Sequence, residues 1–167
     1  MTDPIRAATP ADLGDILQLI RDLAAYEREP DAVKATVESL HGTLFGPTPT
    51  AEAIVAEGGD EFGGEVVGMA LYFTNFSTWS GRDGIYLEDL YVKPGARGTG
   101  LGKALLRHLA QTAVARGCAR LEWSVLDWNE PALAFYRSLG ATAMSDWTVH
   151  RLDGDALATF AGSGSGG

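Results

Sequence analysis

The sequence has 167 residues, 46% of them hydrophobic and 21% charged, which predicts one soluble globular domain over residues 1–161. The formal net charge of −9 argues against nucleic-acid binding, because a phosphate backbone repels an acidic surface. The chain has no run of about 20 apolar residues and does not begin with a basic segment followed by an apolar one, so we expect a cytoplasmic protein without a membrane partner.

Cysteine and histidine do not suggest a disulfide or a metal site. Cys118 is the only cysteine, so no internal disulfide can form, and we interpret it as structural because no base lies near it in sequence. The histidines, His41, His108 and His150, lack the spacing typical of metal ligands. We therefore expect no metal.

The first half of the chain predicts two helices and an antiparallel hairpin. Thr9 and Pro10 are typical of a helix start, and apolar residues then recur at helical spacing until near Arg28. Two apolar segments joined through glycine pairs predict the hairpin. The expected elements are a strand at 5–8, a helix from Pro10 to about Arg28, a helix over 31–44, strands over 51–57 and 65–73, and a loop over 74–83.

The second half alternates strands and helices. The expected elements are a strand from about Gly84 to Val92, a glycine-rich turn, a helix to about Arg116, a strand over 120–125, a short helix capped by Asn129 and ended by Gly140, two closing strands within 141–152, and a last helical turn through Phe160. Residues 162–167 contain only glycine and serine and predict a flexible tail. This order indicates a mixed sheet with helices on its faces.

The glycine-rich turn after the strand at 84–92 predicts an anion site. Gly98, Gly100 and Gly102 alternate through it and lead into a helix. The first N–H groups of a helix have no partner within the helix, and its dipole places partial positive charge at the same end. Arg97 and Lys103 add full positive charges. The turn therefore predicts a site for a phosphate or pyrophosphate group.

Two familiar phosphate loops do not fit this turn. A P-loop requires glycine where this chain has Arg97, and serine or threonine where it has Ala104. A dinucleotide fingerprint requires a last glycine where this chain has Lys103 or Leu105. The sequence therefore predicts neither nucleotide-binding fold.

Arg97, Gly100 and Gly102 instead resemble the acyl-CoA pyrophosphate loop of the GNAT superfamily of N-acetyltransferases, which has arginine or glutamine, two residues, glycine, one residue, and glycine or alanine. The likeness extends to the diamine (spermidine/spermine) and thialysine acetyltransferase branch. It is carried by the segments Ile5–Thr9, Asp15–Leu17, Tyr26–Glu27, Tyr86–Asp89, Asp127–Pro131 and Phe135–Tyr136.

The resemblance implies the α/β (α+β) GNAT fold, with a central mixed, mostly antiparallel sheet of about six to seven strands and helices on both faces. It also implies acetyl-CoA as co-substrate, a small cationic amine as substrate, and a homodimer. The expected activity is acetyl transfer by direct attack of the amine.

Direct attack requires a group that accepts a proton and a group that donates one. A primary alkylammonium has a pKa near ~10.4, so the amine must lose a proton before or during attack. Glu88 is the candidate amine-binding and proton-accepting carboxylate by resemblance, and the alternative is a solvated strand residue. Strand alternation predicts that Glu88 and Asp89 point to opposite faces. Tyr136 is the candidate general acid for the departing thiolate by resemblance, and the alternative is a core aromatic.

The resemblance also assigns binding residues. The acetyl-CoA contacts would come from the backbone of Leu90, Tyr91 and Val92, from the turn residues Arg97, Gly98, Thr99, Gly100, Leu101, Gly102 and Lys103, and from Asn129, Glu130, Pro131 and Ala132. The amine contacts would come from Tyr26, Glu27, Glu88, Glu122, Trp123 and Ser124. From the residues alone, Asn129 is equally a helix cap, and Glu27 an exposed helix end.

One departure keeps the substrate open. Where polyamine enzymes carry an acidic pair late in the chain, this sequence has Ser145-Asp146-Trp147-Thr148, so thialysine or another short diamine or diamino acid is equally expected. Two alternatives are an acetyltransferase for a protein or antibiotic amine and a non-catalytic acyl-CoA sensor. Retention of both Glu88 and Tyr136 argues against the sensor.

Overall fold

The computed structural model describes residues 3–162. They fall into two compact units, one ending at Leu126 and the other beginning at Asp127. The first unit holds the sheet and three α-helices, and the second holds two α-helices.

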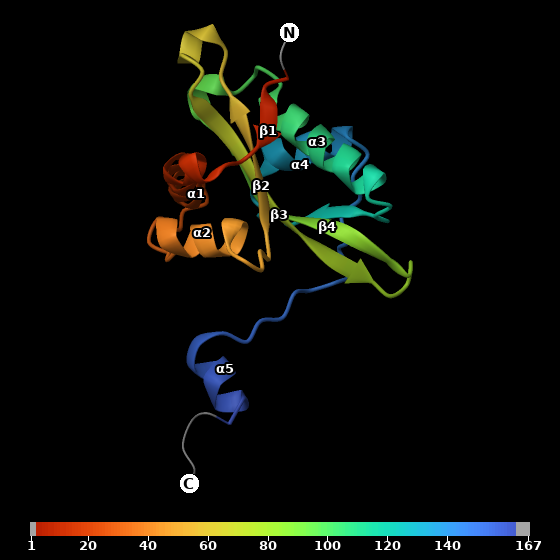
Figure 1. Cartoon of the computed structure of the whole chain (residues 1–167). Helices are drawn as coiled ribbons and strands as arrows, with labels where there is room; N and C mark the ends of the chain where they lie inside the picture. The colour runs from red at the N-terminus through yellow and green to blue at the C-terminus, as the bar shows by residue number, and fades with distance from the viewer. Residues whose placement is uncertain (1–2, 163–167) are drawn as a thin grey trace. The chain divides into compact units, whose positions relative to one another are not determined.

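The first unit is built on a five-stranded mixed sheet (Figure 1). Its strands follow one another in space as they do in sequence, and only the last pair, β4 and β5, is parallel. They are β1 (Ile5–Ala7), β2 (Glu52–Glu57), β3 (Val66–Ser77), β4 (Arg82–Val92) and β5 (Leu121–Trp123). The predicted fold class is confirmed, but the described residues form five strands rather than the six or seven expected.

Helices cover both faces of this sheet, as predicted. α1 (Leu13–Tyr26) and α2 (Val37–Phe45) lie on one face, and α3 (Leu101–Ala115) lies on the other (Figure 1). α3 is part of the crossover that a parallel β4–β5 pair requires.

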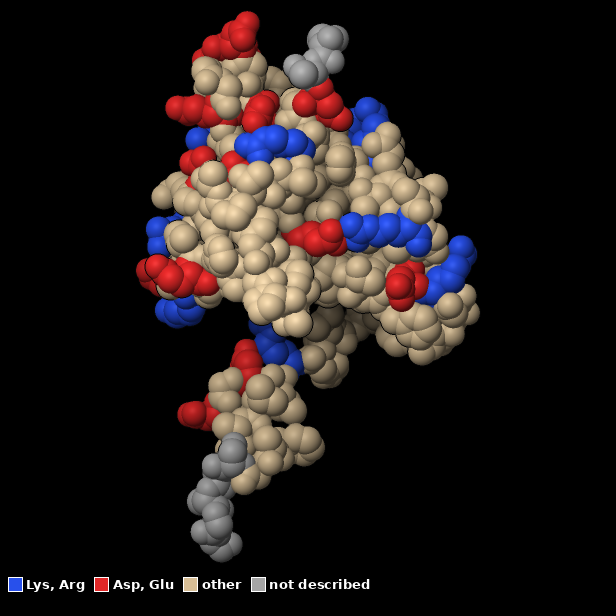
Figure 2. Space-filling model, in the orientation of Figure 1, with Lys and Arg blue, Asp and Glu red and all other residues tan. Residues whose placement is uncertain are grey.

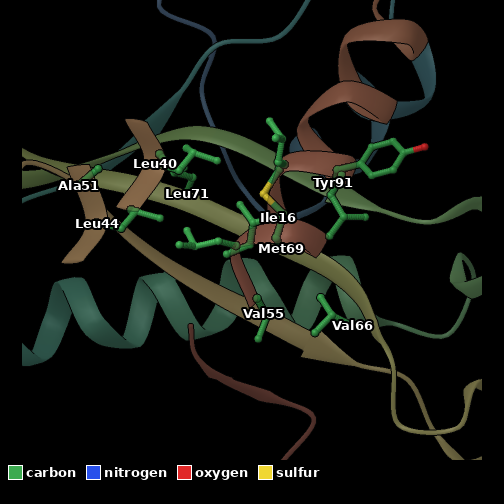
Figure 3. Packing of buried hydrophobic residues seen from close by; sticks show 12 residues of the cluster. Ile16, Leu40, Leu44, Ala51, Val55, Val66, Met69, Leu71 and Tyr91 are labelled. Carbon is green, nitrogen blue, oxygen red and sulfur yellow. The ribbon is translucent and has the colours of Figure 1, made fainter. Parts of the chain in front are cut away.

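The core under α1 and α2 contains side chains from three neighbouring strands. Val55, Met69 and Tyr91 are register partners across β2, β3 and β4, so they share one face of the sheet. Ile16 of α1 packs on them and is fully buried, as are Val55 and Met69 (Figure 3). Tyr91 lies at the edge of this cluster, with its hydroxyl pointing away from the aliphatic side chains (Figure 3). This edge belongs to the candidate site.

Several predicted boundaries are wrong because nonlocal or capping interactions decide them. α2 begins at Val37 rather than residue 31, since the Thr36 side chain accepts a hydrogen bond from the N–H of Ser39 (3.1 Å) and caps the helix there. The predicted loop over 74–83 is mostly strand, because β3 and β4 pair as far as Ser77 and Arg82.

The second unit contains α4 (Glu130–Ser138) and α5 (Gly154–Phe160). The helix expected between Asn129 and Gly140 is confirmed. The two closing strands predicted within 141–152 are absent from that described segment. A strand needs a neighbouring backbone to satisfy its N–H and C=O groups. The predicted tail lies outside the described residues except for Gly162.

Three further features bear on whether the protein could bind a membrane, a nucleic acid or a metal ion. No helix between residues 3 and 162 combines the length and the apolar character that a membrane span requires. On the face of the molecule shown in Figure 2, acidic and basic side chains are interspersed and basic ones form no continuous patch. Within the same residues, no group of three or more acidic, histidine or cysteine side chains could hold a metal ion.

Candidate functional site

A β-bulge in β4 shapes the centre of the candidate site. Asp89 pairs with Leu71 of β3 and Leu87 pairs with Tyr72, so Glu88 is an extra residue without a register partner on β3. The alternation predicted for Glu88 and Asp89 is therefore interrupted here. Because cross-strand partners share a face, Asp89 lies on the face of Leu71, which belongs to the core under α1 and α2.

Three carboxylates converge at this bulge. Glu27, the C-cap of α1, is half-buried, as is Asp89, and Glu88 is exposed. Burial, which is the largest cause, together with the negative charges of Glu88 and Glu27 raises the pKa of Asp89 to about 6. Burial also raises the pKa of Glu27. No lysine or arginine that the structure describes contributes to the pKa shift of Asp89.

Arg97 joins the ends of two elements next to these carboxylates. Its guanidinium carbon lies 5.3 Å from the ring centroid of Tyr26, the last residue of α1, and 5.2 Å from that of Tyr91 on β4. Its Nε donates to the carbonyl of Val92 (3.0 Å). Both distances suit cation–π contacts. The Arg97 side chain predicted for the anion loop is thus bound to two tyrosines and a strand carbonyl.

The glycine turn has the predicted backbone form. Gly98 and Gly100 have φ of 79° and 84°, which explains glycine at both positions, and Gly100 is the N-cap of α3. The N–H of Ala104 donates to the carbonyl of Gly100 (2.9 Å), so the helical ladder begins there. The N–H groups of residues 101–103 come before the first hydrogen bond of that ladder, so they have no acceptor within the helix. A ligand can bind them.

The edge of β4 facing β5 is only partly paired. β5 pairs with Ile85, Tyr86 and Leu87, and this pairing stops at the bulge. Residues 90–92 continue β4 beyond it, paired with β3 on their other side. The predicted acyl-donor contacts therefore lie where β5 leaves β4.

The site residues predicted around β5 differ in their hydrogen bonds, ion pairs and burial. The Tyr86 hydroxyl and Ser124 Oγ are hydrogen-bonded at 2.7 Å, which ties β4 to the residue after β5. Glu122 Oε1 lies 2.9 Å from Arg120 Nε in an ion pair without hydrogen-bond geometry. Trp123 is half-buried. Glu122 is thus already paired, unlike the three carboxylates at the bulge.

The remaining predicted residues belong to the second unit. The Asn129 side chain accepts from the N–H of Ala132 (3.4 Å), which is the capping role expected from its position. Glu130 forms an exposed ion pair with Arg137 (2.7 Å). Tyr136 is half-buried on α4, with its ring centroid 5.7 Å from that of Phe135. The candidate general acid and the bulge carboxylates therefore come from different units.

Three comparisons with known proteins bear on this site. The profile of the Acetyltransferase (GNAT) family matches residues 16–141. A thialysine N-epsilon-acetyltransferase of Bos taurus is 44% identical over 165 residues, which cover 95% of this chain and 96% of that protein. A spermidine/spermine N(1)-acetyltransferase-like protein 1 of Homo sapiens is 34% identical over 163 residues, which cover 94% of this chain and 23% of that protein.

A solved structure supports the same fold. An integron cassette protein from the mobile metagenome of V. cholerae superposes with a TM-score of 0.76 at 28% identity, covering 94% of this chain and 96% of that one.

Proposed function

Because the chain belongs to the Acetyltransferase (GNAT) family, and is thus an N-acetyltransferase, we propose that it acetylates a primary amine of a small diamine or a diamino acid such as thialysine. The acetyl donor is acetyl-CoA. The observation that carries the proposal is the group of carboxylates Glu27, Glu88 and Asp89 at the bulge of β4, because an ammonium group would supply the positive charge that they lack.

Glu88 contacts the reacting amine in this proposal, and the Glu88–Asp89 pair receives its proton. The amine nitrogen attacks the thioester carbon, the C–N bond forms, and the C–S bond breaks. A carboxyl group whose pKa is about 6, as at Asp89, is a stronger base than an ordinary aspartate and is still ionised at neutral pH. Glu27 lies near enough to act on Asp89 and would hold the second, non-reacting amine.

The acetyl donor would bind along the other side of the bulge. Residues 98–103 offer free helical N–H groups and the Lys103 ammonium to a pyrophosphate. The backbone of Leu90–Val92 would receive the extended arm of the donor as an added strand, beyond the point where β5 stops pairing. Asn129–Ala132 at the start of α4 would add further contacts.

Tyr136 is assigned the second proton transfer. A thiolate leaves when the C–S bond breaks, and a phenol with a pKa near ~10 can donate a proton to it. The assignment rests on the match between Phe135–Tyr136 and the family pattern. We also propose a cytoplasmic homodimer, and light scattering on the purified protein tests the dimer.

The two relatives point to short and long amine substrates respectively. One is named for thialysine and the other for spermidine and spermine. The segment Ser145–Thr148 offers a single carboxylate, Asp146. Polyamine enzymes carry an acidic pair where this segment has only Asp146, which favours the short substrate.

The experiment is a release assay for CoA thiol from acetyl-CoA against spermidine, spermine, putrescine, thialysine, lysine and diaminobutyrate. Selective turnover of thialysine or a short diamine is expected, with Tyr136→Phe losing most of kcat. A Tyr136→Phe enzyme with full turnover would contradict the acid assignment. Absence of turnover for every amine, with CoA still bound, would contradict the proposed substrate class and favour a macromolecular amine or a sensor.

A further inference from the structure

The side chain of Arg97 lies on two aromatic rings next to the glycine turn. Its guanidinium lies between two tyrosine rings, at 5.3 Å from Tyr26 and 5.2 Å from Tyr91. The hydrogen bond from its Nε to the Val92 carbonyl (3.0 Å) anchors the group to the end of β4. The side chain therefore connects the end of α1, the end of β4 and the start of the glycine turn.

The two tyrosines are adjacent in sequence to carboxylates of the candidate site. Glu27 directly follows Tyr26, and Asp89 precedes Tyr91 by two residues on the same face of β4. The distance between these carboxylates thus depends on how closely the end of α1 is held to β4. Arg97 has cation–π contacts to both sides, with Tyr26 on α1 and Tyr91 on β4.

This position matters because the carboxylates repel one another. Glu27 and Glu88 both act on Asp89 through like charge. Repulsion of this kind would move the end of α1 away from β4 unless other contacts oppose it. The backbone beyond α1 turns sharply, since Arg28 has φ of 67°. The contacts of Arg97 with Tyr26 and Tyr91 oppose the separation.

We propose that Arg97 is a positioning residue for the amine, holding Tyr26 against Tyr91 so that Glu27 stays beside Glu88 and Asp89, and that it is not a ligand of the donor's pyrophosphate. This inference rests on the proposed function, because it concerns the same amine site. It changes the role that the sequence motif gives to Arg97. It also links the glycine turn to the amine site, because the Arg97 side chain at the start of the turn reaches Tyr26 and Tyr91.

The test compares Arg97→Gln with Arg97→Lys, with a double variant that also carries Tyr26→Leu, and with three further single variants. Tyr26→Leu removes one ring of the stack, Lys103→Gln removes a positive charge from the glycine turn, and Arg82→Gln removes an exposed arginine at the opposite end of β4. The measurements are the KM for the best amine, the Kd for CoA by calorimetry, and hydrogen exchange of the backbone amides in residues 23–29.

Arg97→Gln is expected to raise the amine KM by about tenfold, equivalent to about 1.4 kcal/mol, with the CoA Kd changed less than about threefold. Tyr26→Leu should give the same pattern, and the double variant should be no worse than the single ones, because both remove one stack. Lys103→Gln should raise the CoA Kd and leave the amine KM unchanged. Arg97→Lys should be intermediate, since lysine keeps the charge but not the planar group.

Hydrogen exchange separates failure of this inference from failure of the proposed function. The amides of Glu27, Arg28 and Glu29 donate to the carbonyls of Leu23, Ala25 and Ala24 at the end of α1. Their exchange should become faster in Arg97→Gln and Tyr26→Leu but not in Arg82→Gln, whether or not any tested amine is a substrate. Unchanged exchange, or a CoA Kd raised tenfold with an unchanged amine KM, would overturn the inference.

Discussion

The two halves of β4 differ in the number of strands that flank them. From Ile85 to Leu87 the strand pairs with β3 on one side and β5 on the other, and both of these end residues are buried. From Asp89 to Val92, beyond the bulge at Glu88, it pairs with β3 but not with β5. The first half serves packing, and the second half has a free edge and charged groups. The candidate site lies where one strand loses a neighbour.

The largest effect is expected from a substitution in the second half of β4, which has β3 as its one neighbouring strand. Glu88→Gln should lower kcat/KM by about 10²–10⁴-fold, because it removes the group assigned to accept the amine's proton. Its free energy of unfolding should change by less than about 0.5 kcal/mol, since Glu88 is exposed and has no partner on β3. Steady-state kinetics measure kcat/KM, and urea unfolding measures the free energy of unfolding. Near wild-type kinetics would rule out the assignment.

A substitution in the first half of β4, which is flanked by β3 and β5, should lower stability and leave the kinetics nearly unchanged. Ile85→Ala should lower the free energy of unfolding by about 2–5 kcal/mol, because Ile85 is fully buried between neighbouring strands. The KM for the amine should stay within about threefold of wild type when measured well below the melting temperature. Urea unfolding followed by far-UV circular dichroism gives the stability. A loss of activity without a loss of stability would contradict the division of β4 into two halves.

The smallest effect concerns Asp89 at the boundary between the halves. Its pKa is about 6 in the folded protein and near ~3.9 when unfolded, so between these values the folded state holds more protons. Stability should therefore fall as pH rises from about 4 to 6, and ionised Asp89 should cost on the order of 1 kcal/mol at neutral pH after allowance for solvent screening.

Asp89→Asn should remove this pH dependence. At pH 7.5 the variant should be more stable than wild type by a similar amount, and at pH 4 the two should coincide. Urea unfolding at both pH values is the measurement, and Glu38→Gln, an exposed residue in the first turn of α2, serves as the control. An equal difference at the two pH values would show that charge is not the cause.

Local sequence signals predicted much of the fold. Thr9 and Pro10 mark the approach to α1, and Gly100 marks the start of α3, because capping and backbone conformation depend on a few neighbouring residues. Signals that depend on distant pairing failed. The end of β3 carries Asn75 and Ser77, which are typical of loops, yet pairing with Asp83 and other β4 residues makes the segment a strand.

The bulge shows what the sequence could have revealed about the site. Leu87 and Leu90 are three residues apart, whereas Ile85–Leu87 and Leu90–Val92 are two apart. All four lie on one face because the bulge inserts Glu88. The irregular spacing is the available signal, and the prediction of strict alternation between Glu88 and Asp89 did not take it into account. The contacts of Arg97 with Tyr26 had no such signal, because 71 residues separate them in the chain.

The parallel pairing of β4 with β5 has a consequence for the tolerance of the chain to change. Strands that run in the same direction cannot be joined by a tight turn, and the chain must cross the whole sheet between them. Here that crossing contains the glycine turn and α3. A deletion in the turn would shorten an obligatory connection, so the length of the turn is constrained as well as its glycines at positions 98 and 100. The segment between α1 and α2 joins two helices on one face and carries no such constraint.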